Sequence, residues 1–221
     1  MKKEMIVGAI AAVLATGAVQ AADLGAPAPA APAAVGPWDF AVGAAVTTNY
    51  LFRGISQSNM RPSVSANAEL RYNLNSTFQL YAGVAGASIK LTNIDASPSL
   101  EFDVFGGIRA SIGDLSVDVG GIAYTYHGLG LRPIGPILVF PTIPTCYEGY
   151  VKLGYKVADW LSVGANAFYS PSFLDTGASA SYLSATAKIT LPYDFALSGE
   201  VGRQNFHTAN DIVHGGPFFK M

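Results

Sequence analysis

The feature that most restricts the fold of this chain is an alternation of apolar and polar residues that recurs along most of its length. In Ser63–Leu74 the even positions carry Val, Ala, Ala, Leu, Tyr and Leu, and the odd positions carry Ser, Ser, Asn, Glu, Arg and Asn. Leu100–Ile112 and Tyr147–Val157 follow the same rule. Successive side chains of a strand point to opposite faces, so a period of two predicts strands with one apolar and one polar face.

Six further segments show weaker forms of this alternation and raise the number of candidate strands to nine. These segments are Trp38–Phe52, Phe78–Leu91, Leu115–Tyr126, Leu161–Ser170, Ser179–Leu191 and Phe195–Asn205. Most of the nine are about 10 to 14 residues long. A tilted strand that crosses a membrane needs about 9–11 residues, whereas strands of globular proteins cluster near about 5–6. Strand length therefore favours a membrane barrel.

The connections between the candidate strands alternate strictly between short and long. The short ones are turns rich in Asn, Gly, Asp and Pro, at Asn73–Thr77, Gly113–Asp114, Ala158–Trp160 and Pro192–Asp194. The long ones are Arg53–Arg61, Thr92–Pro98, His127–Thr145 and Pro171–Ala178. Outer-membrane barrels have tight periplasmic turns and longer external loops, and this pattern fits them if the N-terminus is periplasmic. A soluble β-sandwich or lipocalin-like barrel has no reason to sort its loops by side.

The first 21 residues resemble a secretory signal peptide. Lys2-Lys3 precedes the apolar run Met5–Val19, and Val19-Gln20-Ala21 offers the small residues that a signal peptidase reads. An apolar run of about 15 residues is too short to anchor a helix across a bilayer. We therefore expect export and cleavage after Ala21, with a buried N-terminal helix as the alternative.

The remaining chain predicts one domain: an all-β, up-and-down antiparallel transmembrane β-barrel of the outer-membrane type. Residues 22–37 form an Ala/Pro-rich linker, residues 38–206 hold the barrel, and residues 207–221 form an irregular tail without alternation. Nine strands is an odd number, whereas bacterial single-chain barrels have even numbers of strands. We therefore expect an incomplete, open barrel, explained by a truncated or frame-shifted C-terminus, with an atypical tenth strand from the tail as the alternative.

The composition argues against several functional classes. Only 13% of the residues are charged and the formal net charge is -2, which does not favour binding to nucleic acid. Cys146 is the only cysteine, and His127, His207 and His214 do not stand at metal-ligand spacing. No motif places a nucleophile beside a base. We therefore expect no catalytic residues, no metal site, no cofactor and no enzymatic activity.

Charged residues on the polar faces of the strands should point into the barrel, because a charge that faces lipid at mid-depth costs about 2–4 kcal/mol. There they would either pair into a network that plugs a narrow lumen or line an aqueous path for small solutes. The predicted lumen-facing residues are Glu69, Arg71, Glu101, Asp103, Arg109, Asp118, Glu148, Lys152, Lys156, Lys188 and Glu200.

The first long connection carries a resemblance to a known family. Residues 49–58 read Asn-Tyr-Leu-Phe-Arg-Gly-Ile-Ser-Gln-Ser, and this run resembles the opening of the Gcw_chp family of uncharacterised exported proteins, also described as TorF-type porins. The likeness continues at Tyr81–Val84 and Glu101–Gly107. The resemblance implies an outer-membrane barrel with a channel role and brings no catalytic or ligand residues. Its motif residues are Tyr50, Phe52, Arg53, Gly54, Ile55, Ser56, Gln57 and Ser58.

The Arg53-Gly54 step itself predicts a tight bend, with a guanidinium able to bond carbonyls of its own loop. Taken together, the sequence predicts an outer-membrane porin or small-solute channel. Its partners would be outer-membrane lipid, the barrel assembly machinery and small solutes, with no nucleic acid. A structural or adhesive barrel with a plugged lumen and a soluble periplasmic β-barrel or sandwich that binds a ligand are the alternatives.

Overall fold

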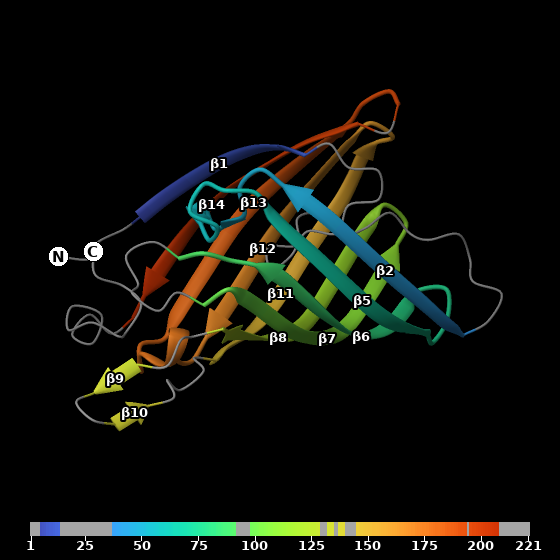
Figure 1. Cartoon of the computed structure of the whole chain (residues 1–221). Helices are drawn as coiled ribbons and strands as arrows, with labels where there is room; N and C mark the ends of the chain where they lie inside the picture. The colour runs from blue at the N-terminus through green and yellow to red at the C-terminus, as the bar shows by residue number, and fades with distance from the viewer. Residues whose placement is uncertain are drawn as a thin grey trace.

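The computed structural model describes residues 5–13, 37–91, 98–128, 132–134, 137–139, 145–193 and 195–207. Ten strands form one sheet in the order β1-β14-β13-β12-β11-β8-β7-β6-β5-β2, and every pair of neighbours is antiparallel (Figure 1). The strands are β1 (Met5–Val13), β2 (Trp38–Thr47), β5 (Ser63–Asn73), β6 (Phe78–Ser88), β7 (Leu100–Ile112), β8 (Leu115–His127), β11 (Thr145–Ala158), β12 (Leu161–Ser170), β13 (Ala180–Thr190) and β14 (Ala196–Phe206).

The long strands from β2 onward confirm the nine predicted strands and their up-and-down order. Each pairs with the next long strand along the chain, and tight turns join β5 to β6, β7 to β8, β11 to β12 and β13 to β14. The longer connections carry small elements of their own. These are the two-residue strands β3 (Leu51–Phe52) and β4 (Ile55–Ser56), the hairpin of β9 (Arg132–Ile134) and β10 (Ile137–Val139), and the 3-10 turn η1 (Phe173–Asp175).

The sheet curls around a common interior but does not close (Figure 1). An open barrel is what the odd number of predicted strands, nine, leads us to expect. In the described part of the chain β2 pairs with β5 alone, and no ladder joins it to β1 or β14. The predicted tail from residue 208 onward lies outside the described residues. Among the residues that the structure does describe, no helix is both long and apolar enough to cross a membrane.

Strand β1 occupies the second edge of β14, in a register that runs from Met5 opposite Gln204 to Val13 opposite Ala196. An edge strand presents unpaired N–H and C=O groups, so an added strand satisfies them. β1 lies within the predicted signal peptide. Cleavage after Ala21 stays a prediction, and it would remove β1 from this edge.

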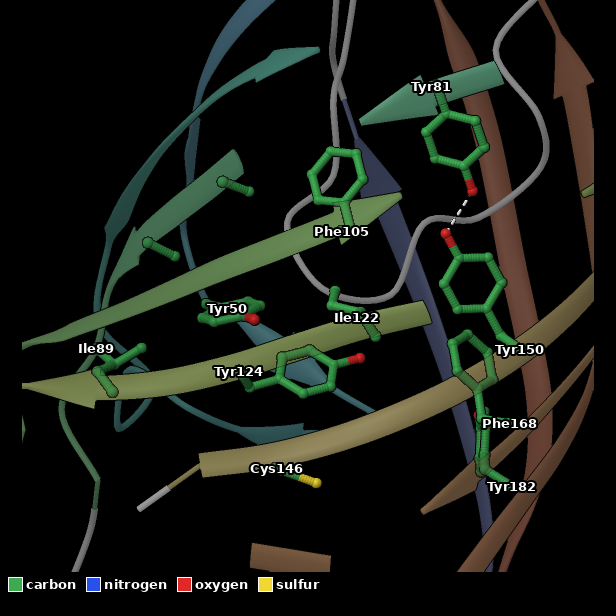
Figure 2. Packing of buried hydrophobic residues seen from close by; sticks show 12 residues of the cluster. Tyr50, Tyr81, Ile89, Phe105, Ile122, Tyr124, Cys146, Tyr150, Phe168 and Tyr182 are labelled. Atoms are coloured by element: carbon green, nitrogen blue, oxygen red, sulfur yellow. Dashed lines mark hydrogen bonds between the residues drawn. The ribbon is translucent and has the colours of Figure 1, made fainter. Parts of the chain in front are cut away.

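The two faces of the sheet differ as the alternation predicts. Along β11 the exposed residues Val151 and Leu153 alternate with the buried residues Tyr150 and Lys152. We call the concave side, which carries the buried residues, the inner face. Its aromatic and apolar core is drawn in Figure 2 and comprises Tyr50, Tyr81, Ala85, Ala87, Ile89, Phe105, Ile122, Tyr124, Cys146, Tyr150, Phe168 and Tyr182.

Glycines on the inner face make room for these rings on neighbouring strands. A Cβ atom added to Gly107 would lie 2.8 Å from the hydroxyl oxygen of Tyr81 and 2.3 Å from the carbonyl oxygen of Val119. A Cβ at Gly120 would lie 2.6 Å from the hydroxyl oxygen of Tyr150. All three distances are shorter than real Cβ contacts, so the tyrosine hydroxyls can occupy these places only because both positions lack side chains.

Candidate functional site

The candidate site lies where residues 49–58, which we call the motif loop, meet the inner face. The loop turns back at Arg53 and Gly54, whose φ angles are 48° and 78°, and the small β3–β4 hairpin closes around them. At the base of the hairpin the amide of Gln57 donates to the carbonyl of Tyr50 at 2.8 Å, and the amide of Tyr50 donates to the hydroxyl of Ser58 at 2.9 Å. These bonds hold Tyr50 and Arg53 in fixed positions, with both side chains buried.

Arg53 crosses the interior and joins two distant strands. Its Nη2 lies 2.6 Å from Glu148 Oε2 on β11, and its Nη1 donates to Glu148 Oε1 at 3.1 Å and to Gln204 Oε1 on β14 at 2.8 Å. The guanidinium also lies 5.0 Å from the ring centre of Phe168 and 4.4 Å from that of Tyr182. The predicted partners were carbonyls of its own loop, whereas these partners come from the sheet.

Tyr50 contacts a second group, near the beginning of β7. Its hydroxyl donates to the carboxylate of Glu101, which Tyr126 also hydrogen-bonds. Asp103, two residues further along the same face, is 1% exposed. Its Oδ1 has no hydrogen-bond partner. Tyr50 and Tyr124 both belong to the buried cluster drawn in Figure 2.

A network of arginines and carboxylates lies toward the opposite end of the strands. Arg109 donates to both carboxylate oxygens of Glu69, at 2.7 and 2.9 Å, and from its Nε to Asp118 at 3.2 Å. Arg71 bonds the same Glu69 carboxylate and lies 3.2 Å from Asp39. Two arginines therefore pair with three carboxylates on β2, β5 and β8, and with Arg109 on β7 the network draws on four strands.

Two tyrosines extend this network toward the middle of the inner face. The hydroxyl of Tyr81 donates to Asp118 Oδ1 at 2.5 Å and lies 2.5 Å from the hydroxyl of Tyr150, as the dashed line in Figure 2 marks. Because Tyr81 has one proton to donate, Tyr150 must be the donor in the second bond. The ammonium of Lys152 lies 4.3 Å from the ring centre of Tyr150.

The structure places most of the predicted charged residues in these groups. Glu69, Glu101, Asp103, Asp118, Glu148 and Lys152 are buried, and Arg71 and Arg109 are half-buried. Glu200 accepts a hydrogen bond from Tyr182, and Lys188 is half-exposed. Lys156 is exposed and pairs with Asp159 at 2.6 Å, and this hydrogen bond lowers the pKa of the Asp159 carboxyl. Of the motif residues, Tyr50, Arg53 and Ser58 are buried, Phe52, Ser56 and Gln57 are half-buried, and Gly54 and Ile55 are exposed.

Sequence reasoning missed several residues of the site, among them Asp39, Tyr81, Tyr150 and Gln204. A signal existed in the alternation of their strands. Asp39, Tyr81 and Tyr150 each fall in the polar register of their strand, where the neighbours two positions away face the interior. An aromatic residue in the polar register therefore predicts an inward-facing side chain, just as a charged residue does.

The chemistry available in the site is that of ion pairs, phenols and carboxylates. In the part of the chain whose side chains are described, no three His, Cys, Asp or Glu residues gather as a metal centre would require. The acidic groups fall into two sets. Arginines pair with one set, whereas Glu101, in the other, accepts hydrogen bonds from phenols and lies close to Asp103. The two sets meet at the loop end of the inner face, where Arg53 pairs with Glu148 and Tyr50 of the same loop bonds Glu101.

Fold and site together define a class of protein: a curled up-and-down antiparallel sheet with an ion-paired interior and an apolar exterior. The family model described as a bacterial protein of unknown function (Gcw_chp) matches residues 31–213, and the chain belongs to this family. The match confirms the resemblance carried by the motif loop. No curated protein and no solved structure matches the chain.

Proposed function

We propose that this chain is an outer-membrane β-barrel protein whose inner face lines a narrow path for small solutes. The observation that carries the proposal is the apolar outer face, since all nine long strands from β2 onward expose a large apolar side chain while most of the charges lie inside. Water would penalise such a surface, whereas lipid favours it. One exposed residue from each strand illustrates it: Phe40, Leu70, Leu80, Val104, Val119, Val151, Val163, Leu183 and Val201.

Strand length and loop pattern support the same assignment. The nine strands are between 10 and 14 residues long, enough for tilted membrane crossings. A periplasmic N-terminus would place the tight turns in the periplasm and the longer connections outside. In this proposal the signal peptide directs export, the barrel assembly machinery inserts the chain, and outer-membrane lipid covers its outer face.

The motif hairpin would narrow the path. Arg53 is held by Glu148 and Gln204, and Tyr50 is held by Glu101, so the hairpin is tied to the interior through both side chains. The Arg109 network narrows the other end. A path constricted in this way suits ions and the smallest polar solutes, because larger ones would have to break several buried ion pairs.

Two experiments test the proposal in sequence. Sucrose-gradient fractionation should recover the protein with outer membranes; recovery in the soluble periplasmic fraction would support the soluble binding protein instead. The purified, refolded protein in a planar bilayer should then give small discrete conductance steps. Arg53→Ala should increase the step size severalfold because it releases the hairpin, whereas Lys156→Ala, at an exposed pair, should leave it unchanged.

A structural or adhesive barrel with a plugged lumen is the second candidate, and the pairing of Arg53, Arg71 and Arg109 with inner-face carboxylates favours it. Such a network rigidifies an interior as effectively as it constricts one. The plugged barrel predicts membrane recovery together with no conductance steps from either the natural chain or Arg53→Ala.

A further inference from the structure

We propose that Glu101 and Asp103 form a binding site for a small hard cation of the Ca²⁺ class, beneath the motif hairpin. The site uses carboxylate and phenol oxygens from β7, β8 and the hairpin. It does not require that the barrel conduct, so it goes beyond the function proposed above.

The first argument is uncompensated charge. Glu101 and Asp103 lie two residues apart on one face of β7 and are 2% and 1% exposed. The arginines of the inner face are engaged elsewhere, Arg53 with Glu148 and Arg109 with Glu69. Among the described side chains no ion pair reaches Glu101 or Asp103. Two adjacent buried carboxylates can both be ionised only if a positive charge lies between or beside them.

The second argument is the Oδ1 atom of Asp103. It is buried and lacks a hydrogen-bond partner. The neighbouring carboxylate, that of Glu101, does have hydrogen-bond partners, namely Tyr50 and Tyr126. A buried polar atom without a partner is rare in native proteins, and a bound ion is one of the few arrangements that satisfies it. The free oxygen therefore points to a ligand and not merely to an acidic composition.

The third argument is the type of donor. The groups that carry the site are all oxygens: the carboxylates of Glu101 and Asp103 and the phenols of Tyr50 and Tyr126. Oxygen donors favour hard cations, whereas Zn²⁺ prefers histidine and cysteine. A divalent ion would balance the two negative charges. With only two carboxylates, the affinity should be weak, with a Kd on the order of 10⁻⁴–10⁻³ M as in low-affinity calcium modules.

The position of the site also suits a cation that enters from the loop end of the sheet. Glu101 is the second residue of β7, next to the long connection that precedes the strand. Tyr50 covers it from the hairpin side and is itself held by Ser58. The hairpin would therefore cover the ion, and Tyr50 would belong both to the hairpin and to the ion site.

Terbium luminescence tests the site directly on the full chain refolded in detergent. Tb³⁺ is a hard ion, and tyrosines near the site would sensitise its emission. We expect saturable emission that Ca²⁺ displaces. Asp103→Asn should weaken Tb³⁺ binding at least tenfold, and Tyr50→Phe should lower the sensitised emission. Asp159→Asn, which removes an exposed carboxylate, is the matched control and should change neither quantity.

The outcomes separate this proposal from the channel. Absence of saturable emission, or equal Tb³⁺ affinity for the natural chain and Asp103→Asn, would overturn the cation site whatever the conductance. Saturable, Asp103-dependent emission without conductance steps would support the site and reject the channel. Asp103→Asn removes a charge and keeps the shape of the side chain, so the variant should still fold. Heat-modifiable migration on a gel verifies this. Glu101→Gln is a second variant with the same expected loss of Tb³⁺ affinity.

Discussion

The guanidinium of Arg53 and the carboxylate of Glu148 form a buried ion pair, with 2.6 Å between Nη2 and Oε2, across 95 positions of sequence. The side chains are only 4% and 1% exposed. This pair fixes the motif loop to β11 and holds part of the loop inside the curled sheet. It is therefore the contact whose removal should report most clearly on the role of the loop.

We predict that Arg53→Ala destabilises the folded protein by about 3–5 kcal/mol, because it leaves the Glu148 charge buried without its partner. Urea unfolding of the protein in lipid vesicles, followed by tyrosine fluorescence, measures this loss. Replacing both residues with apolar ones, as in Arg53→Met with Glu148→Leu, should recover much of it. Equal stability of Arg53→Ala and the natural chain would show that the pair does not anchor the loop.

Labelling should distinguish the two faces in the membrane. With Cys146 replaced by Ala, single cysteines at Val151 or Leu153 should resist a water-soluble maleimide, because the proposed membrane covers both. A cysteine at Asp159, in the exposed turn after β11, should react and serves as the control. The same resistance is expected at Leu70, Val104 and Ile108. Rapid labelling at these sites would rule out a lipid-covered outer face.

Two glycines on opposite faces should respond differently to a single methyl group. A Cβ at Gly107 would lie 2.3 Å from the carbonyl oxygen of Val119, so Gly107→Ala should cost about 1–3 kcal/mol of unfolding free energy. Gly149→Ala is the matched control, since its nearest neighbour would be the carbonyl oxygen of Gly120 at 4.0 Å. Both are strand glycines, so the backbone contribution is similar. Comparable effects in urea unfolding would contradict the close packing of Tyr81 across Gly107.

Epitope insertion tests the proposed orientation. Gly177 and Gly113 both have positive φ and open space around them, so each turn should accept a short insertion. An epitope after Gly177 should bind antibody on intact cells, and one after Gly113 only after the outer membrane is permeabilised. The opposite result would reverse the topology, and binding at neither site in permeabilised cells would indicate that the inserted chains fail to accumulate.

The sequence alone predicts the strands, their order and their faces. Side-chain direction in a strand depends only on residue parity, which is a local property. The polar register of β7 is therefore enough to place Glu101, Asp103 and Arg109 on one face, and the alternation of short and long connections is enough to indicate the up-and-down order. The odd strand number likewise predicts that the sheet does not close.

Only the tertiary structure decided which of these charges meet. Its neighbours in sequence suggest that Arg53 bonds its own loop, but its partners, Glu148 and Gln204, come close only when the sheet curls. Likewise Asp103 and Arg109 share one face of β7, yet Arg109 has carboxylates on β5 and β8 while Asp103 Oδ1 has no hydrogen-bond partner. Pairing across strands depends on register and curvature, and these are set by the whole sheet, whereas the alternation that chooses a face is set by each residue's immediate neighbours.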